Sequence, residues 1–271
     1  MKTAQLPRTD LRMSRFVFGT ASLFNVGAAK ARDALLRAAV DAGFTHFDTA
    51  PLYGFGHAES DLAPVLRDHP DLTLTTKVGI YAPGGEDQTA SVVWLRKAAG
   101  RLLGRLSRAQ VDFSLARARA SLEASLRRTG REAIDLYLLH EPTHALTRTD
   151  EWQQWLLDCV RLGKVRHFGV ALHTDELAPF LSASPSLCSV VQVLDTLDGP
   201  AVAVLQGHGR TPQITYGYVS AALRADPAAD VADVLTRALR RNRDGAVVVS
   251  TGRIARLAQY ARIAQETTLD P

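Results

Sequence analysis

The feature that most constrains the fold is a regular alternation between two kinds of segment. Short runs rich in β-branched and aromatic residues are followed by Ala-, Leu- and Arg-rich stretches with apolar residues at helical spacing. The runs predict strands at Phe16–Ala21, Thr45–Thr49, Leu72–Val78, Ile134–His140, Val165–Ala171, Ser189–Val193, Gln213–Gly217 and Ala246–Ser250. The stretches predict helices at Lys30–Ala42, His57–Asp68, Leu115–Thr129, Glu151–Leu162, Thr174–Leu181, Pro200–Gly207, Pro227–Arg241 and Arg253–Gln265.

Such an alternation predicts an α/β fold with a parallel sheet. Eight strand–helix units in 271 residues favour a single (β/α)8 TIM barrel, which typically takes about 250 residues. An open, doubly wound sheet is the alternative. We therefore expect one domain over residues 1–271. The chain is 46% hydrophobic and 22% charged, a balance that excludes disordered and fibrous proteins.

Several predicted helix ends carry capping residues. Ser114 directly precedes the predicted helix Leu115–Thr129, and Gly130 directly follows it. Ser114 is therefore expected to be the N-cap, and Gly130 to end the helix in a left-handed conformation. Asp150 is expected to cap the next helix, and Gly43 to end the first one.

Residues 79–112 do not fit the alternation. They form a long connection after the third predicted strand, and they include a basic amphipathic piece, Val92–Leu106, with Trp94. Long connections inside a compact domain are often lids or partner surfaces, so we expect an insertion that can cover the substrate. An extra solvated helix on the rim is the alternative.

Charge and cysteine content exclude several other classes. The 32 basic and 28 acidic residues give a net charge of +4, and without a basic stripe this predicts no nucleic-acid partner. No apolar run is long enough for a membrane span, and the N-terminus lacks a signal-peptide pattern, so we expect a cytoplasmic protein. Cys159 and Cys188 lie in apolar surroundings and are interpreted as core residues.

Familiar short motifs are either absent or in the wrong context. His140 and His144 satisfy the H-E-x-x-H pattern of zinc peptidases. The preceding residues predict a strand, however, and Pro142 would break the required helix, so we expect no metal site. There is no phosphate-binding P-loop, no dinucleotide fingerprint and no nucleophile elbow.

Four polar residues stand where predicted strands end. Asp48 and Tyr53 follow the second strand, Lys77 ends the third and His140 ends the fourth. The carboxyl ends of barrel strands open onto one face, which holds the active site in enzymes of this fold. We therefore expect these four side chains to lie together.

This set suits proton donation to a carbonyl oxygen while a hydride reaches the carbonyl carbon. A phenol has an ordinary pKa of about 10, which a nearby ammonium lowers. A carboxylate is needed to pair with a buried ammonium, and a neutral imidazole can orient a carbonyl. Taken singly, each residue also has a purely structural explanation. Asp48 could cap a turn, Tyr53 could pack on the barrel rim, Lys77 could be a solvated charge, and His140 could be a core histidine. Their coincidence favours catalysis.

These segments resemble the aldo-keto reductase family. The family's first signature is similar to GFTHFDTAPLYGFGHAE, residues 43–59, and its lysine-bearing strand to LTTKVG, residues 74–79. Its central signature is similar to SLARARASLEASLRRTGREAIDLYLLHEP, residues 114–142. The resemblance extends from RFVFGTASL near the start to RIARLAQYA near the end.

The resemblance implies a catalytic tetrad of Asp48, Tyr53, Lys77 and His140, with Tyr53 as the general acid. It also implies a nicotinamide cofactor, NADPH with NADH as the alternative, bound without a Rossmann domain. The implied cofactor-binding residues are Gly19, Thr20, Gln192, Tyr216, Ser250, Thr251, Gly252, Arg253 and Arg256. Gln192 would lie beside the carboxamide and Tyr216 against the nicotinamide ring. Arg253 or Arg256, at the start of a predicted helix, would bind the 2′-phosphate of the cofactor. The alternative is that both arginines are ordinary charged residues on the helix surface.

The sequence departs from the family pattern after the fifth strand. Ala171 and Leu172 stand where the family commonly has polar residues that hold the carboxamide, and His173 is a candidate substitute. The loop after the eighth strand is short, and residues 1–271 stop soon after the last predicted helix, so we expect no C-terminal tail of the kind that covers the substrate in many relatives. The substrate pocket is therefore expected to include Leu23, Phe24, Phe55 and Tyr81.

The resulting hypothesis is an NADPH-dependent reductase of an aldehyde or ketone, monomeric or weakly homo-oligomeric, with a small carbonyl compound as its partner. Two alternatives remain at this stage. One is an NAD(P)⁺-dependent sugar or alcohol dehydrogenase, and the other is a non-catalytic NADPH-binding regulatory subunit.

Overall fold

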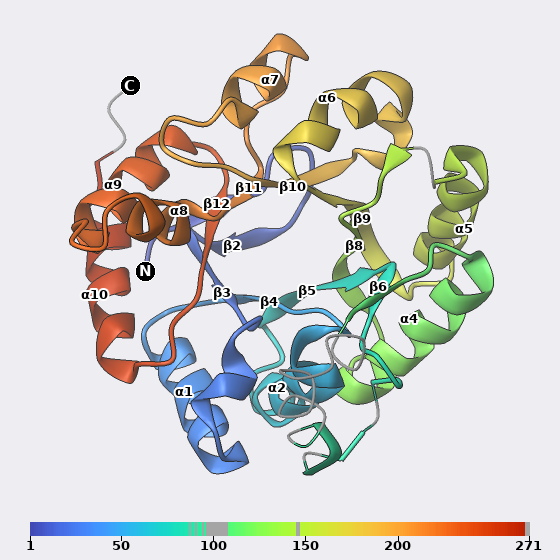
Figure 1. Cartoon of the computed structure of the whole chain (residues 1–271), viewed down its shortest axis with the longest axis horizontal. Coiled ribbons are helices and arrows are strands. Elements are labelled where there is room, and N and C mark those ends of the chain that lie inside the picture. Colours follow the sequence, from blue (N-terminus) through green and yellow to red (C-terminus); the bar gives the residue numbers. More distant parts are fainter. Residues whose placement is uncertain (87, 90, 94, 96–107, 145–146, 269–271) are drawn as a thin grey trace.

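The computed structural model describes residues 1–86, 88–89, 91–93, 95, 108–144 and 147–268. Within this part, eight parallel strands close into a barrel with helices around it (Figure 1). In spatial order they are β3 (Phe16–Gly19), β4 (His46–Asp48), β5 (Thr73–Val78), β8 (Ile134–His140), β9 (Val165–Leu172), β10 (Val190–Leu194), β11 (Ile214–Tyr216) and β12 (Ala246–Val249). Pairing of β12 with β3 closes the ring. The barrel prediction is confirmed, and the open sheet is excluded.

The helices lie outside the barrel (Figure 1). They are α1 (Ala29–Asp41), α2 (His57–Asp68), α4 (Leu115–Thr129), α5 (Thr149–Arg161), α6 (Thr174–Ala183), α7 (Ala201–Gly207), α8 (Tyr218–Ala225), α9 (Val231–Arg241) and α10 (Ile254–Glu266). Among the described helices, none has both the length and the apolar character needed to cross a bilayer.

The helix ends test the capping predictions. The Ser114 side chain accepts a hydrogen bond from the Arg117 amide, and Gly130 takes a left-handed conformation with φ of 67°, as predicted. The prediction for Asp150 was wrong, because α5 already begins at Thr149 and Asp150 lies in its first turn. The start of α9 was also placed too early. Asp230 caps this helix by accepting a hydrogen bond from the Ala232 amide at 2.8 Å.

Side chains of the strands divide into two cores. In β8, which is buried along its whole length, Leu136 and Leu138 belong to the cluster inside the barrel. The alternating residues Tyr137 and Leu139 belong to the larger cluster between the barrel and the helices. This alternation follows from the two-residue period of a strand and explains why β8 reads as a continuous apolar run.

An N-terminal hairpin, which the sequence analysis did not predict, covers one end of the barrel. It pairs β1 (Thr3–Gln5) with β2 (Arg12–Ser14) in antiparallel register. Leu6, Leu11 and Met13 of the hairpin are buried in the same cluster as Val17 and Leu136 of the barrel interior. The hairpin therefore closes the amino-terminal pole and leaves the carboxyl ends of the strands as the accessible face.

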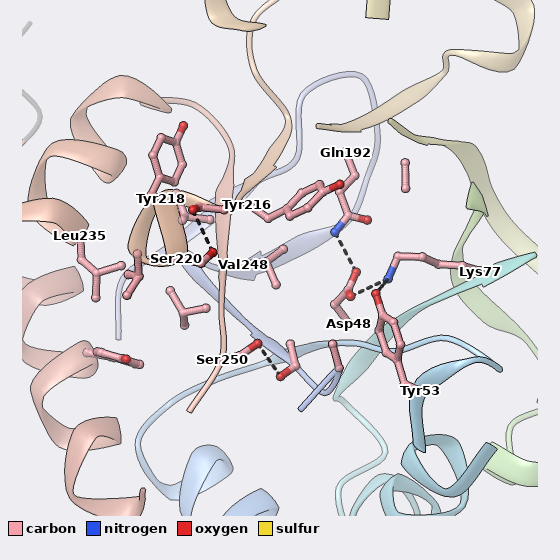
Figure 2. A pocket seen from close by; sticks show the side chains of 18 of the residues that line it. Asp48, Tyr53, Lys77, Gln192, Tyr216, Tyr218, Ser220, Leu235, Val248 and Ser250 are labelled. Carbon is pink, nitrogen blue, oxygen red and sulfur yellow. Dashed lines mark hydrogen bonds and ion pairs between the residues drawn. The ribbon is translucent and has the colours of Figure 1, made fainter. Parts of the chain in front are cut away.

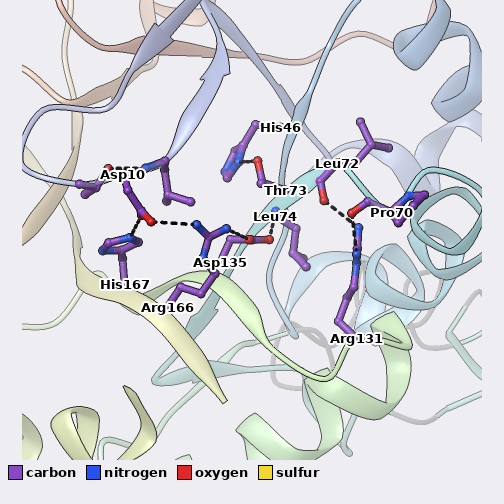
Figure 3. Close-up of polar contacts among 12 residues, drawn as sticks. Asp10, His46, Pro70, Leu72, Thr73, Leu74, Arg131, Asp135, Arg166 and His167 are labelled. Atoms are coloured by element: carbon purple, nitrogen blue, oxygen red, sulfur yellow. Dashed lines mark hydrogen bonds and ion pairs between the residues drawn. The ribbon is translucent and has the colours of Figure 1, made fainter. Parts of the chain in front are cut away.

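Ion pairs hold the hairpin to the strands (Figure 3). The Asp10 carboxylate lies 2.5 Å from His167 Nε2 and 3.2 Å from Arg166 Nη2. Arg166 also donates to Asp135 Oδ1 at 2.8 Å. Asp135 in turn accepts a hydrogen bond from the Leu74 amide at 2.9 Å. The chain of contacts links the hairpin to β9, β8 and β5.

The two ends of the connection after β5 lie side by side. β6 (Ile80–Tyr81) pairs with β7 (Gln110–Val111) in antiparallel register. Most of the predicted amphipathic piece 92–106, including Trp94, lies outside the described residues. A role of this insertion as a lid stays a prediction.

Candidate active site

The four residues expected to converge do lie together at the carboxyl ends of the strands. Lys77 Nζ donates to Asp48 Oδ1 at 2.6 Å and to the Thr49 carbonyl at 3.0 Å. The phenolic oxygen of Tyr53 is 3.3 Å from the same Nζ (Figure 2). The rings of Tyr53 and His140 meet edge to face, with centroids 5.8 Å apart. A phenol, an ammonium, a carboxylate and an imidazole thus share one site.

Three strand ends and one turn position these side chains. Asp48 and His140 are the last residues of β4 and β8, and Lys77 is the penultimate residue of β5. Tyr53 begins the short turn η2 (Tyr53–Gly56), in which the next three residues have positive φ. A Cβ on Gly56 would lie 2.1 Å from the Glu86 carbonyl oxygen, so only glycine fits there.

Burial and the lysine act in opposite directions on the tyrosine. Burial raises the pKa of Tyr53, and the Lys77 ammonium lowers it; the net result is a raised pKa. The expected lowering by the ammonium is therefore present but outweighed by burial. Burial lowers the pKa of Lys77, yet Asp48 and then Tyr53 oppose it, and the net pKa is raised. The free site thus holds a protonated phenol beside a charged ammonium.

His140 is neutral in this environment. Burial lowers its pKa well below the usual value, and the Lys77 charge acts in the same direction. Its Nδ1 is buried and has no hydrogen-bond partner among the described residues. A neutral imidazole can hydrogen-bond a carbonyl oxygen without competing as a stronger acid.

A cavity of about 390 Å³ extends from the four residues across the barrel rim. Figure 2 shows Asp48, Lys77 and Tyr53 on one side and Tyr218 and Ser220 of α8 on the other. The remaining lining residues include Gly19, Glu141, Ala171, Gln192, Tyr216, Val219, Leu223, Leu235, Val248, Ser250 and Tyr260.

Sequence reasoning missed the α8 side of this cavity. Gly217 has φ of 104° and directly precedes α8, a position at which glycine often begins a new element. The following YVSAALRA has apolar residues at helical spacing. These two signals together could have predicted the helix.

Four of the expected cofactor-binding residues line the cavity. They are Gly19, Gln192, Tyr216 and Ser250. Gln192 Nε2 donates to Asp48 Oδ2 at 2.9 Å, whereas its Oε1 is buried and has no partner in the described part of the chain. An amide N–H of a ligand would satisfy that oxygen. A Cβ at Gly19 would lie 2.7 Å from Ser250 Oγ, so these two residues approach closely.

The other expected cofactor-binding residues lie away from the cavity lining. Thr20 is buried and donates to the Asp48 carbonyl at 3.0 Å. Thr251 Oγ1 accepts from the Arg253 amide at 3.1 Å. Gly252 and Arg253 are exposed at the start of α10, and Arg256 is half-buried. A role of these residues in phosphate binding stays a prediction.

The residues expected in the substrate pocket do not line this cavity either. Phe24 and Phe55 pack with Ala82 and Val93 in a small cluster beside η2. Leu23 belongs to the outer core. Tyr81 is 1% exposed, and the Arg117 guanidinium lies 4.2 Å above its ring. Roles of these four residues in a substrate pocket stay predictions.

The structure also shows why His140 and His144 do not form the helical pair of a zinc peptidase. β8 ends at His140, and Glu141 has φ of 48°, which is incompatible with a right-handed helical turn. In the part of the chain that is described, no group of His, Cys, Asp and Glu side chains could hold a metal ion.

At the end of β9, the residues that depart from the family pattern have distinct positions: Ala171 and Leu172 are the last two residues of the strand, and His173 follows it. Ala171 lines the cavity, and Leu172 is buried. His173 Nε2 lies 3.1 Å from Glu141 Oε1. Glu141 lines the cavity, and sequence reasoning did not single it out.

Solved structures share the whole fold. An aldo-keto reductase from Bacillus halodurans in its holo form has a TM-score of 0.76 at 20% identity, covering 99% of this chain and 92% of that one. An aldo-keto reductase from Klebsiella pneumoniae in complex with NADPH has a TM-score of 0.70 at 21% identity, covering 98% and 90%.

Curated proteins are similar over part of their length. The 6-dehydroglucose reductase of Novosphingobium aromaticivorans is 35% identical over 186 residues, which cover 64% of this chain and 53% of the relative. The pyridoxal 4-dehydrogenase of Microbacterium luteolum is 29% identical over 198 residues, 62% and 54% of the two chains. The chain thus spans about half the length of the curated relatives it matches.

The family comparison covers the strands that carry the four clustered residues. The model of the Aldo/keto reductase family matches residues 15–184, which is more than half of the chain. On this match, the chain belongs to the aldo/keto reductase family.

Proposed function

We propose that this protein reduces an aldehyde or ketone to the alcohol with NADPH, and that Tyr53 donates the proton. The observation that carries the proposal is the position of the Tyr53 hydroxyl, 3.3 Å from Lys77 Nζ, with Lys77 in turn 2.6 Å from Asp48. A protonated phenol beside a buried ammonium can act as a general acid, because the ammonium stabilises the phenolate that forms when the proton leaves.

Each of the four side chains then has one role. Tyr53 is protonated because burial raises its pKa, so it can give a proton to the carbonyl oxygen. Lys77 stabilises the phenolate that remains, and Asp48 keeps the buried lysine charged. His140, neutral and edge to face with Tyr53, orients the carbonyl.

The residues present fit a nicotinamide cofactor. When bound, the cofactor supplies the hydride. Gln192 Oε1 is a buried acceptor without a partner among the described residues, so a ligand N–H would satisfy it, and Tyr216 lines the same cavity. Gly19 and Ser250 line the same cavity. We propose NADPH over NADH because Arg253 and Arg256 stand at the start of α10, where cations and helix amides favour a phosphate.

The names of relatives support a small carbonyl substrate. Besides the 6-dehydroglucose reductase, they include an L-glyceraldehyde 3-phosphate reductase and a D-threo-aldose 1-dehydrogenase. The activities in these names interconvert carbonyl compounds and alcohols or sugars. Because some of these relatives are named as dehydrogenases, the reverse reaction, oxidation of an alcohol or sugar with NAD(P)⁺, should be assayed as well.

The test is a Tyr53→Phe variant, assayed for loss of NADPH absorbance with a panel of aldehydes and ketones. We expect the variant to lose at least about 10²-fold in reduction rate, the usual contribution of a general acid. Binding of NADPH, followed by fluorescence titration, should remain. Tyr81→Phe is the matched control, because it removes a tyrosine hydroxyl that lies outside the cavity.

Two results would contradict this function. Undiminished turnover in Tyr53→Phe would remove the proposed proton donor. Tight NADPH binding by the unaltered protein with no turnover of any carbonyl or alcohol would instead support the regulatory-subunit alternative.

A further inference from the structure

Glu141 places a carboxylate at the cavity that the catalytic scheme does not use. It directly follows His140, and this residue lines the same cavity as Tyr53 and Tyr216. Burial is the main reason that the pKa of Tyr216 is raised, and the Glu141 charge acts in the same direction. The same charge also contributes to the raised pKa of Tyr53. The carboxylate thus exerts its field where a substrate would meet the proton donor.

The charges around the cavity leave Glu141 without a compensating lysine or arginine. Asp48 and Lys77 form an ion pair 2.6 Å apart, so their charges largely cancel. His140 is neutral, because burial lowers its pKa. Among the described residues that line the cavity, no other side chain of Asp, Glu, Lys or Arg occurs. The neighbour of Glu141 is the half-exposed imidazole of His173, 3.1 Å away.

The backbone holds this carboxylate in place. Glu141 has φ of 48°, a left-handed conformation that non-glycine residues rarely adopt. Its amide donates to the Ala171 carbonyl at 2.8 Å, and its side chain contacts His173 on the β9–α6 connection. A strained residue persists only where its surroundings determine it, and such residues cluster at functional sites.

We propose that Glu141, held by His173, is a specificity-determining residue that makes the cavity accept uncharged carbonyl compounds and disfavour anionic ones. This inference rests on the proposed function, since it concerns the substrate of the same site. A carboxylate or phosphate on the substrate would be repelled by a like charge in a partly desolvated cavity. Specificity of this kind comes from a repulsive element rather than from an added contact.

The experiment compares 4-formylbenzoate with 4-formylbenzamide, which have nearly the same shape and differ in charge. For the unaltered enzyme with NADPH, we expect kcat/KM for the amide to exceed that for the carboxylate by about tenfold, which corresponds to about 1.4 kcal/mol. Glu141→Gln replaces the carboxylate by an isosteric amide. In this variant we expect the amide-to-carboxylate ratio to fall to below about threefold, mainly through a lower KM for 4-formylbenzoate.

Two control variants separate the local charge from other effects. Asp175→Asn removes an exposed carboxylate at the start of α6 that does not line the cavity. Its amide-to-carboxylate ratio of kcat/KM should equal that of the unaltered enzyme. His173→Gln removes the imidazole but supplies an amide N–H that can hold the Glu141 carboxylate in its place, so the amide-to-carboxylate ratio should stay at least as high. A ratio that is the same in Glu141→Gln and the unaltered enzyme overturns the proposal. So does a ratio that collapses equally in His173→Gln.

A binding measurement keeps this test independent of turnover. Isothermal titration of the two compounds into the protein saturated with NADP⁺ should show the same preference for the amide, and its loss in Glu141→Gln. If no carbonyl compound is reduced, the proposed function fails. The titration then still decides whether Glu141 selects by charge.

Discussion

Lys77 is the residue on which the chemistry of the site depends most. It is 2% exposed, and its ammonium contacts a carboxylate, a carbonyl and the phenol of Tyr53. Burial lowers its pKa, but Asp48 and Tyr53 outweigh burial and raise it. A charged lysine in this position stabilises the phenolate, and it exists there only because Asp48 compensates it.

Removing one partner of this pair should therefore cost stability as well as activity. In Lys77→Met the Asp48 carboxylate stays buried without its cation, and we expect the free energy of unfolding to fall by about 3–5 kcal/mol. The double variant Lys77→Met/Asp48→Asn removes the buried charge as well and should recover a large part of that loss. Urea denaturation monitored by circular dichroism measures both. Equal destabilisation of the single and double variants would contradict an effect of uncompensated charge.

The site residues differ in how far they could be predicted. Asp48, Tyr53, Lys77 and His140 were found because strand ends of a barrel converge, so sequence position alone places them together. Glu141 was not predicted as a site residue, because a glutamate that follows a strand is typical of a solvent-exposed turn. Its positive φ and its contact with His173 are properties of the folded backbone.

At the scale of elements, a single turn connects the insertion with Tyr53, the proposed proton donor. The η2 turn carries Tyr53, and the segment after β6 packs against it through Ala82, Val93 and the Glu86 backbone. Arg117 of α4 holds Glu86 with contacts of 2.7 and 2.8 Å to both carboxylate oxygens. The position of Tyr53 thus depends on packing between η2 and residues about thirty positions further on.

Gly56→Ala should disturb that packing. The added Cβ would lie 2.1 Å from the Glu86 carbonyl oxygen in a residue with φ of 87°. We expect a loss of about 2–3 kcal/mol in unfolding free energy from strain and clash together, and a reduction rate at least about tenfold lower because Tyr53 moves.

Gly85→Ala provides the matched control for this variant. Gly85 has a similar φ of 94°, but an added Cβ would meet nothing within 4 Å. It should show the cost of backbone strain alone, about 1 kcal/mol, with a reduction rate close to that of the unaltered protein. A Gly56→Ala variant with the same rate as Gly85→Ala would show that η2 tolerates displacement.

The elements themselves were mostly predictable. All eight barrel strands were predicted within a few residues, since buried parallel strands give continuous β-branched runs. The β1–β2 hairpin was missed because strands of three residues show no periodicity. α8 was missed because no element was predicted between the strand ending at Gly217 and the helix starting at Pro227, although α8 fills eight of these residues.

At the scale of the whole molecule, the two ends of the barrel differ, because one is covered and the other carries the cavity. The hairpin and the ion pairs around Asp135 close one pole, and the cavity lies at the other. Length and alternation predicted the closed barrel, but which pole is covered depends on tertiary contacts of residues 6–13 that no local pattern reveals. A buried histidine inside the barrel links this architecture to pH.

His46 lies in the barrel with both ring nitrogens 2.7 Å from the hydroxyls of Thr73 and Thr75. Burial lowers its pKa from 6.5 to about 3, and the Lys77 charge acts in the same direction. Below pH 6.5 the unfolded chain therefore binds a proton that the folded chain does not. The stability from this group is present above pH 6.5 and is lost as the pH falls towards 3, by at most about 1.4 kcal/mol per pH unit.

We therefore expect the free energy of unfolding to decline between pH 6.5 and pH 3, and His46→Gln to flatten that decline. Glutamine is polar enough to bond the two threonine hydroxyls, yet it takes up no proton in this range. His208→Gln is the control, since that histidine is exposed. Urea denaturation at a series of pH values measures the slopes. His140 is also buried with a lowered pKa, so part of the slope should remain in His46→Gln and disappear in His46→Gln/His140→Gln. An unaltered slope in the double variant would mean that carboxylates, not buried imidazoles, govern acid unfolding of this barrel.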